Sequence, residues 1–184
     1  MNKSADDAAG LAIAENLGGS VRSLQQSGRN AQDGISFIQV AEGGMNEVGN
    51  MIIRLRELGV QAASDTVGQN ERQYLDRGAQ QLKLEIERIS QGTEYNGTKL
   101  LNGSGDKFDF QIGIKNDEFL DRISYDPGQT NVSTDALGIG DIEINEKGGA
   151  QDSLGALDEA LIVLNANRAS LGALQNRMNS TISN

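Results

Sequence analysis

The chain of 184 residues contains no histidine, no cysteine and no tryptophan, and only one proline. Without histidine, the chain cannot form a Ser-His-Asp or Cys-His catalytic group or an HExxH zinc site. Without cysteine, disulfides, zinc ribbons and iron–sulfur clusters are excluded. The sequence therefore predicts a protein that is not an enzyme, with no catalytic residue, no bound metal and no cofactor.

Long apolar runs and a surplus of positive charge are also missing. No stretch of about 18 apolar residues is available to cross a bilayer, and the first residues carry no apolar signal segment. The chain has 26 acidic and 16 basic residues, a formal net charge of -10, which disfavours binding to nucleic-acid phosphates. We therefore expect no nucleic-acid partner and no membrane partner. Because aromatic residues make up only 4% of the chain, an aliphatic core of helices packed along their length is favoured.

Residues 6–63 contain no proline and carry a helical pattern. Apolar or small residues recur there at steps of three and four, the spacing of a coiled-coil seam. The seam comprises Leu17, Val21, Leu24, Gly28, Ala31, Ile35 and Ile38, and then Met45, Val48, Ile52, Leu55, Gly59 and Ala62. Its large apolar side chains are expected to lie in a core within the chain.

Nine glycines lie inside this segment. Each costs about 0.8–1 kcal/mol relative to alanine in a helix interior, so a solitary helix would not tolerate them. Either the helix breaks at the Gly18-Gly19 and Gly43-Gly44 pairs, or neighbouring helices that approach closely at the glycines supply the missing stability. We favour the second alternative, one continuous helix.

Two further helices and a β-rich stretch follow. The spacing of apolar residues predicts a second helix over residues 69–91 and a third from about Gln151 to the end of the chain. Between them, alternation of apolar and polar residues at 108–112 and 142–145 predicts short strands. Asp126-Pro127-Gly128 predicts a turn, because proline fixes φ and glycine accepts a positive φ.

The Gly148-Gly149 pair is expected to end the β-rich stretch. The predicted fold class is therefore mainly α, an elongated bundle of three long antiparallel helices. A small β-hairpin region is inserted between the second and third helices.

Several short stretches of the chain resemble bacterial flagellin. They are residues 4–13 (SADDAAGLAI), 29–36 (RNAQDGIS), 41–43 (AEG), 55–63 (LRELGVQAA), 94–101 (EYNGTKLL) and 170–177 (SLGALQNR). The resemblance implies that residues 1–103 are the N-terminal part of the flagellin core domain and 151–184 its C-terminal helix. Residues 104–150 are unmatched and would be a short variable β-rich insert.

The resemblance implies a structural subunit of the bacterial flagellar filament, secreted to the cell exterior, that self-assembles into a helical propeller for motility. In flagellins, further terminal segments form the inner tube of the filament, and we expect both to be missing here. This chain should then stay monomeric, whereas the full-length protein would form a homopolymer with other flagellin subunits. The alternative is a flagellin-like hook–filament junction adaptor, whose helices look alike.

The resemblance also implies two sets of contact residues. A host Toll-like receptor reads residues around 54–61 in many flagellins. Arg54 and Leu58 match its dominant positions, with Gln61, Arg56 and Glu57 beside them, while the supporting acid of the family falls at Gly78. Alternatively, Arg54 and Arg56 only solvate the helix or contact filament neighbours. Contacts with neighbouring subunits are expected at Arg29, Asn30, Gln32 and Asp33.

Overall fold

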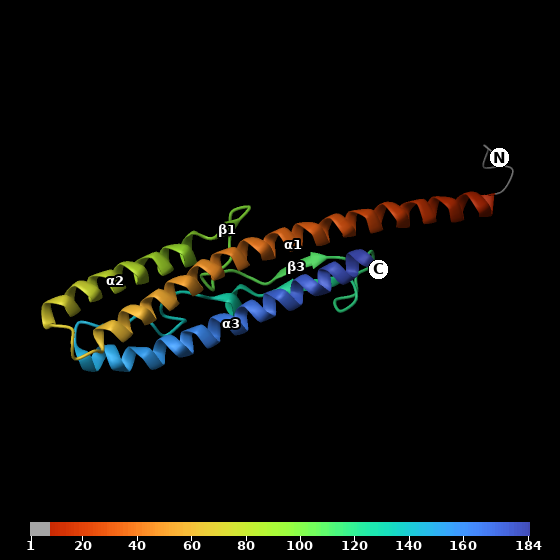
Figure 1. Ribbon diagram of the computed structural model, residues 1–184. Helices are drawn as coiled ribbons and strands as arrows, with labels where there is room; N and C mark the ends of the chain where they lie inside the picture. The colour runs from red at the N-terminus through yellow and green to blue at the C-terminus, as the bar shows by residue number, and fades with distance from the viewer. Residues whose placement is uncertain (1–7) are drawn as a thin grey trace. The chain divides into compact units, whose positions relative to one another are not determined.

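The computed structural model describes residues 8–184 and is mainly helical, as predicted (Figure 1). Its helices are α1 (Ala8–Ala62), α2 (Gln69–Gly92) and α3 (Lys147–Ser183). Two antiparallel strand pairs lie between α2 and α3, with a 3-10 turn at Pro127–Thr130. The first pair is β1 (Glu94–Tyr95) with β2 (Thr98–Lys99), and the second is β3 (Phe108–Gln111) with β4 (Arg122–Tyr125).

The described residues form two compact units. The hairpin unit consists of residues 8–36, 108–125 and 174–184, and the three-helix unit of residues 37–107 and 126–173. Helices α1 and α3 each contribute residues to both units.

Helix α1 is continuous through all its glycines, as favoured, but a Cβ added at Gly18, Gly19, Gly28 or Gly43 would meet no atom within 4 Å, so neighbours approach closely only at some of the glycines. In the three-helix unit, a Cβ added at Gly49 would lie 3.1 Å from Leu164 Cδ2, and one added at Gly59 would lie 3.2 Å from Leu154 Cδ2. These two approaches show that α1 and α3 run antiparallel, in contact at the glycines. The seam residues Met45, Val48, Ile52 and Leu55 are at most 2% exposed and form the core there.

Helix α2 also runs antiparallel to α1 in the three-helix unit (Figure 1). Its Gly78 faces Leu58, and Arg72 in its first turn lies beside the end of α1. The Arg72 side chain, only 9% exposed, donates from Nε to the Ala62 carbonyl at 2.8 Å and from Nη2 to the Ser64 carbonyl at 2.7 Å. Helix ends leave carbonyls without intrahelical donors, so Arg72 caps α1 from a neighbouring helix.

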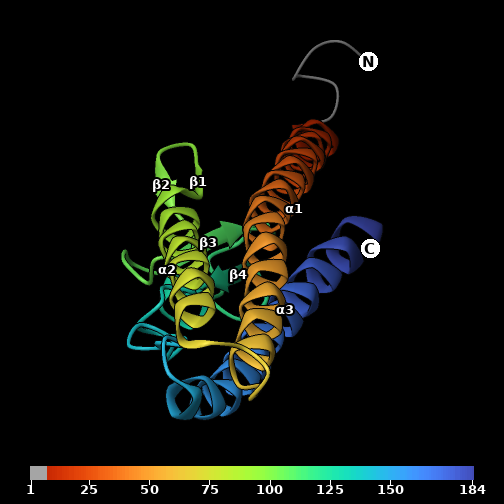
Figure 2. The same cartoon turned by 60° about the vertical axis from the view of Figure 1, so that its left-hand side comes forward.

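The β1–β2 hairpin follows directly on the end of α2 (Figure 2). Its turn residues Asn96 and Gly97 have φ values of 50° and 80°, the left-handed geometry that an Asn-Gly pair adopts in tight hairpins. The Tyr95 ring packs edge-on against Phe37 of α1, with ring centroids 5.7 Å apart. The hairpin is thereby attached to the three-helix unit.

The strand predicted at residues 142–145 is wrong, because the backbone of this segment pairs with side chains of α2 and not with another strand. The Ile142 carbonyl accepts from Gln80 Nε2 at 3.1 Å and from Lys83 Nζ at 2.9 Å, and the Ile144 N–H donates to an Asp76 carboxylate oxygen at 2.8 Å. Helix α3 also begins earlier than predicted, at Lys147, so the Gly148-Gly149 pair lies inside its first turn.

In the hairpin unit, β3 is bonded to α1 through polar side chains. Ser27 Oγ donates to the Gly113 carbonyl at 3.0 Å, and Asn30 Nδ2 donates to the Gln111 carbonyl at 2.9 Å. One turn further along, a Cβ added at Gly34 would lie 2.8 Å from the sulfur of Met178 in α3. Glycine therefore lets α3 come close to α1 in this unit.

The first part of the predicted seam is not a core within the chain. Leu17, Val21 and Leu24 are 62%, 53% and 56% exposed. Met178 already packs at Gly34, and α3 ends at Ser183, so no described residue covers these three side chains. The spacing correctly identified one face of α1, but that face is buried only from Ala31 onward.

Candidate functional site

Arg54, Leu58 and Gln61 lie on one face of α1, because positions i, i+4 and i+7 of a helix share a face. Arg54 and Gln61 are exposed, and Leu58 is half-buried where it contacts the neighbouring helix α2. A Cβ added at Gly78 of α2 would stand 3.7 Å from Leu58 Cδ1, an ordinary van der Waals distance. These three residues form the α1 polar face.

Glu57 belongs to the same face and forms a salt bridge with Arg54 one turn away. Both side chains are more than half exposed, so this pair contributes little to stability. Gly78 of α2 supplies no carboxylate beside Leu58, and the acid that pairs with Arg54 comes from the same helix. The Arg54 guanidinium therefore stays accessible at the surface.

Arg56 lies apart from the α1 polar face and points toward α3. Its Nε donates to Asp158 Oδ1 at 2.6 Å. This hydrogen bond lowers the pKa of Asp158 and raises that of Arg56, with the opposite charges adding to both shifts. Arg56 also lines a shallow hollow of about 290 Å³ with Ile53, Glu57 and Val60. The structure thus separates Arg56 from Arg54, Leu58 and Gln61.

The residues predicted to contact neighbouring subunits differ in their exposure and in their bonds within the chain. Arg29, Gln32 and Asp33 are exposed on α1, and Arg29 donates to Gln26 Oε1 at 2.7 Å. Asn30 is half-buried and serves inside the hairpin unit, because its side chain holds the Gln111 carbonyl. Arg29, Gln32 and Asp33 therefore remain available for contacts outside the chain, whereas the Asn30 amide is already engaged.

Sequence reasoning missed two features of the hairpin unit. Ser27 gives the sequence no signal, because its hydroxyl acts on a carbonyl 86 positions away. Phe119 and Leu120, 83% and 70% exposed, form an apolar pair in the loop between β3 and β4. Two adjacent apolar residues inside the charged stretch 115–122 are a signal that could have been read.

Among residues 8–184, no cluster of three or more acidic side chains is placed to hold a metal ion. Within the same residues, none of the helices combines the length and the apolar character needed to cross a bilayer.

Comparison with known proteins identifies the family of the chain. The family model described as "Bacterial flagellin N-terminal helical region" matches residues 1–106. The chain belongs to the bacterial flagellin family. This family consists of structural proteins of the bacterial flagellum, so the chain is a flagellar structural protein and not an enzyme.

Relatives match the flagellin chain over nearly its whole length. It is 39% identical over 184 residues to flagellin of Halalkalibacterium halodurans, covering all of this chain and 66% of that relative. It is 36% identical to the flagellar filament 33 kDa core protein of Treponema phagedenis, covering 99% of this chain and 68% of that protein. The chain thus spans about two thirds of the length of these relatives.

Solved structures agree on the fold. The crystal structure of Bacillus cereus flagellin is 26% identical and superimposes with a TM-score of 0.74, covering 85% of this chain and 88% of that one. A putative flagellar hook-associated protein of Vibrio parahaemolyticus gives a TM-score of 0.77 at 13% identity, covering 98% and 93% of the two chains. The second likeness shows a shared fold alone.

Proposed function

We propose that this flagellin chain is a subunit of the flagellar filament that packs against other flagellin subunits outside the cell. The observation that carries the proposal is the match of nearly the whole chain to about two thirds of a flagellin and of a flagellar filament core protein. When the two contacting surfaces differ, each subunit can bind the next and an open polymer forms.

Deletion of the gene in the source bacterium tests the filament role. We expect cells without filaments in electron micrographs, and filaments restored by the wild-type gene. Unchanged filaments in the deletion strain would contradict the proposal. Light scattering of the 184-residue chain itself should report monomers, and long polymers would overturn that expectation.

A hook–filament junction adaptor is the alternative function. The shared fold does not separate the two, because flagellin and a hook-associated protein both superimpose on this chain. The family model and the relatives favour a flagellin. Antibody labelling of intact flagella distinguishes the two, since a filament subunit is labelled along the whole length and an adaptor only near the base.

The α1 polar face is proposed as a ligand for the host Toll-like receptor that binds flagellin. Arg54 and Leu58 combine an accessible guanidinium with a neighbouring apolar side chain, the composition of many binding hot spots. Gly78 of α2 offers no carboxylate beside Arg54 and Leu58. Receptor binding should therefore depend on Arg54 of α1, without an acidic contact from α2.

A receptor reporter-cell assay tests this second role. The Arg54→Ala chain should give a response about tenfold weaker than wild type, as expected for the loss of a hot-spot arginine. Arg77→Ala is the matched control, because Arg77 is also exposed but lies on α2 over the Tyr74 ring. Equal responses from wild type and Arg54→Ala would remove Arg54 from the receptor site.

A further inference from the structure

The loop between β3 and β4 presents an apolar knob, defined as Phe119 and Leu120. Their side chains are 83% and 70% exposed, the highest values among the large apolar residues described. Exposed apolar side chains clustered together mark interaction surfaces more often than single ones do. An aromatic ring adds a large contact area that becomes dry on binding.

The knob is held in place by hydrogen bonds within its loop. The Phe119 and Leu120 N–H groups donate to Asp117 Oδ1 at 2.9 and 2.8 Å. The Asp121 carboxylate, 7% exposed, accepts from the Asp117 N–H at 3.0 Å and the Lys115 N–H at 3.2 Å. A loop with a fixed backbone loses little conformational entropy when it binds, so the knob is preorganised.

Cations without a carboxylate partner surround the knob. Lys115, Arg122 and Arg177 form no salt bridge with any described residue, although Arg122 donates to the neutral Asn116 amide. Phe119, Arg122 and Arg177 line one hollow of about 380 Å³, together with Glu118 and Ser124. The lining of this hollow carries two positive charges and one negative charge, and Asp117 and Asp121 of the same loop add two further negative charges.

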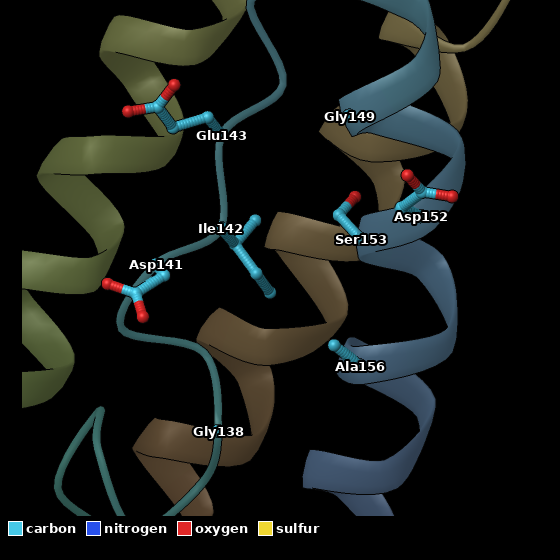
Figure 3. A pocket seen from close by; sticks show the side chains of 8 residues that line it. All are labelled: Gly138, Asp141, Ile142, Glu143, Gly149, Asp152, Ser153 and Ala156. Atoms are coloured by element: carbon cyan, nitrogen blue, oxygen red, sulfur yellow. The ribbon is translucent and has the colours of Figure 1, made fainter.

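A second hollow, in the three-helix unit, has the opposite character (Figure 3). This acidic-rimmed hollow has a volume of about 340 Å³, at the lower end of the range of ligand pockets. Ile142 points across it toward Ser153 and Ala156 of α3, with Gly138 and Gly149 completing the lining.

Three acidic residues belong to the lining of this hollow, and their carboxylates point outward from the space between Ile142 and Ser153 (Figure 3). Asp152 projects from α3, whereas Asp141 and Glu143 lie on the far side of the Ile142 segment (Figure 3). None of the three forms a salt bridge with another residue in the range 8–184. An apolar floor inside a polar rim is the usual composition of a protein interface.

We infer that the Phe119–Leu120 knob of one copy of this chain docks into the acidic-rimmed hollow of a second copy. The ring of Phe119 would cover Ile142 and Ala156, while Lys115, Arg122 and Arg177 meet Asp141, Glu143 and Asp152. The three cations and three anions form no salt bridge among residues 8–184, although Arg122 donates to Asn116 and Glu143 accepts from Asn145, so the second copy supplies the opposite charge to both sets. The inference rests on the proposed filament role and adds the surfaces through which two subunits meet.

The two surfaces are different, so the contact is heterologous and does not close on itself. Each copy retains a free hollow and a free knob after one contact has formed. Because the contact is small, it is transient in the isolated chain and agrees with the monomer expected in light scattering. Trapping by a covalent bond is therefore the suitable measurement.

Disulfide trapping tests the contact, because the natural chain has no cysteine. One copy carries Leu120→Cys, which keeps Phe119 of the knob, and the other carries Gly155→Cys next to Ala156 of the hollow, where an added Cβ meets no atom within 4 Å. Gly172→Cys is the matched control, since it is also an open glycine of α3 but lies away from the hollow. We expect heterodimers with Gly155→Cys to form about tenfold faster than with Gly172→Cys, and equal rates would overturn the inference.

Two variants test the chemistry of the contact. Phe119→Ala in the Leu120→Cys copy should lower the rate to that of the Gly172→Cys control. Arg177→Glu in one copy or Asp152→Lys in the other should each slow trapping, and the two together should restore it. A rate unchanged by Phe119→Ala, or no restoration by the paired charge reversal, would contradict docking at these surfaces.

The result of disulfide trapping can be interpreted separately from the result of the gene deletion that tests the filament role. If deletion of the gene removes filaments but trapping equals the control, only the docking contact is wrong. If trapping succeeds but the deletion strain keeps its filaments, the filament role is wrong and the contact serves another assembly of this chain.

Discussion

Two adjacent glycines of α1, Gly43 and Gly44, should respond in opposite ways to alanine. A Cβ added at Gly43 meets no atom within 4 Å. A Cβ added at Gly44 would lie 2.7 Å from Leu101 Cδ1 and 2.9 Å from Thr93 Oγ1. Neither neighbour can easily move away, because Leu101 is fully buried and the Thr93 hydroxyl donates to the Ile89 carbonyl at 2.7 Å.

The magnitudes follow from these two environments. Gly43→Ala gains the helix propensity of alanine, about 0.8–1 kcal/mol, which raises Tm by about 2–4 °C in a chain of this size. Gly44→Ala gains the same propensity but adds a methyl group to a filled space, at a cost of about 1–3 kcal/mol. The two variants should therefore differ by about 1–3 kcal/mol, with Gly44→Ala the less stable.

Thermal and urea unfolding followed by circular dichroism at 222 nm measures the difference. A double-mutant cycle adds a sharper test: Leu101→Ala should destabilise the Gly44→Ala chain less than the wild type, because it makes room for the new methyl group. Equal stabilisation by Gly43→Ala and Gly44→Ala would refute the argument that close approach at chosen glycines holds α1 together.

Three further predictions concern polar groups. Arg72→Ala should lower the free energy of unfolding, measured by urea titration, by about 2–3 kcal/mol, because the carbonyls of Ala62 and Ser64 lose a charged donor. The control Arg77→Ala, at an exposed position, should change the free energy of unfolding by less than about 0.5 kcal/mol in the same titration. Hydrogen bonds from Gln91, and then from Thr134, lower the pKa of Glu87 in the folded chain. Its contribution to stability is therefore complete above the unfolded pKa of about 4.3 and is lost as the pH falls through the folded value, so Glu87→Gln should lose less stability than wild type between neutral and acid pH. Asp121→Ala should speed amide hydrogen exchange at Lys115 and Asp117 by about tenfold without changing exchange in α2, and unchanged exchange at those two amides would contradict the description of the loop.

The sequence predicted the elements whose signals are local. The bounds of α2 follow from apolar spacing, and the structure reproduces them to within one residue. The position of the α1 stripe was also predictable, because a period of 3.6 defines a face. The part of this face that becomes buried was not predictable from the sequence. Leu17 and Ile52 occupy equivalent positions in the pattern, yet Leu17 is 62% exposed and Ile52 is fully buried.

The contacts that depend on distant residues were beyond the sequence. Residues 142–145 alternate as a strand does, yet their backbone bonds go to Asp76, Gln80 and Lys83, far away in the chain. In the candidate site, the resemblance selected Arg54, Leu58 and Gln61, and helix α1 places them on one face. Arg56 points instead to Asp158, a partner 102 positions away that no helical period could indicate.

The way residues 142–145 are attached has a consequence for how this flagellin can change over time. The segment is held through its main-chain carbonyls and N–H groups, with Gln69 reaching the Asn145 carbonyl at 3.0 Å in addition to the α2 residues above. Main-chain atoms are the same whatever the side chain, so many substitutions in the segment leave its attachment intact. Mutational tolerance should therefore be high at the exposed Glu143, and low at Ile144, which is 1% exposed, and at the α2 positions that bond the segment.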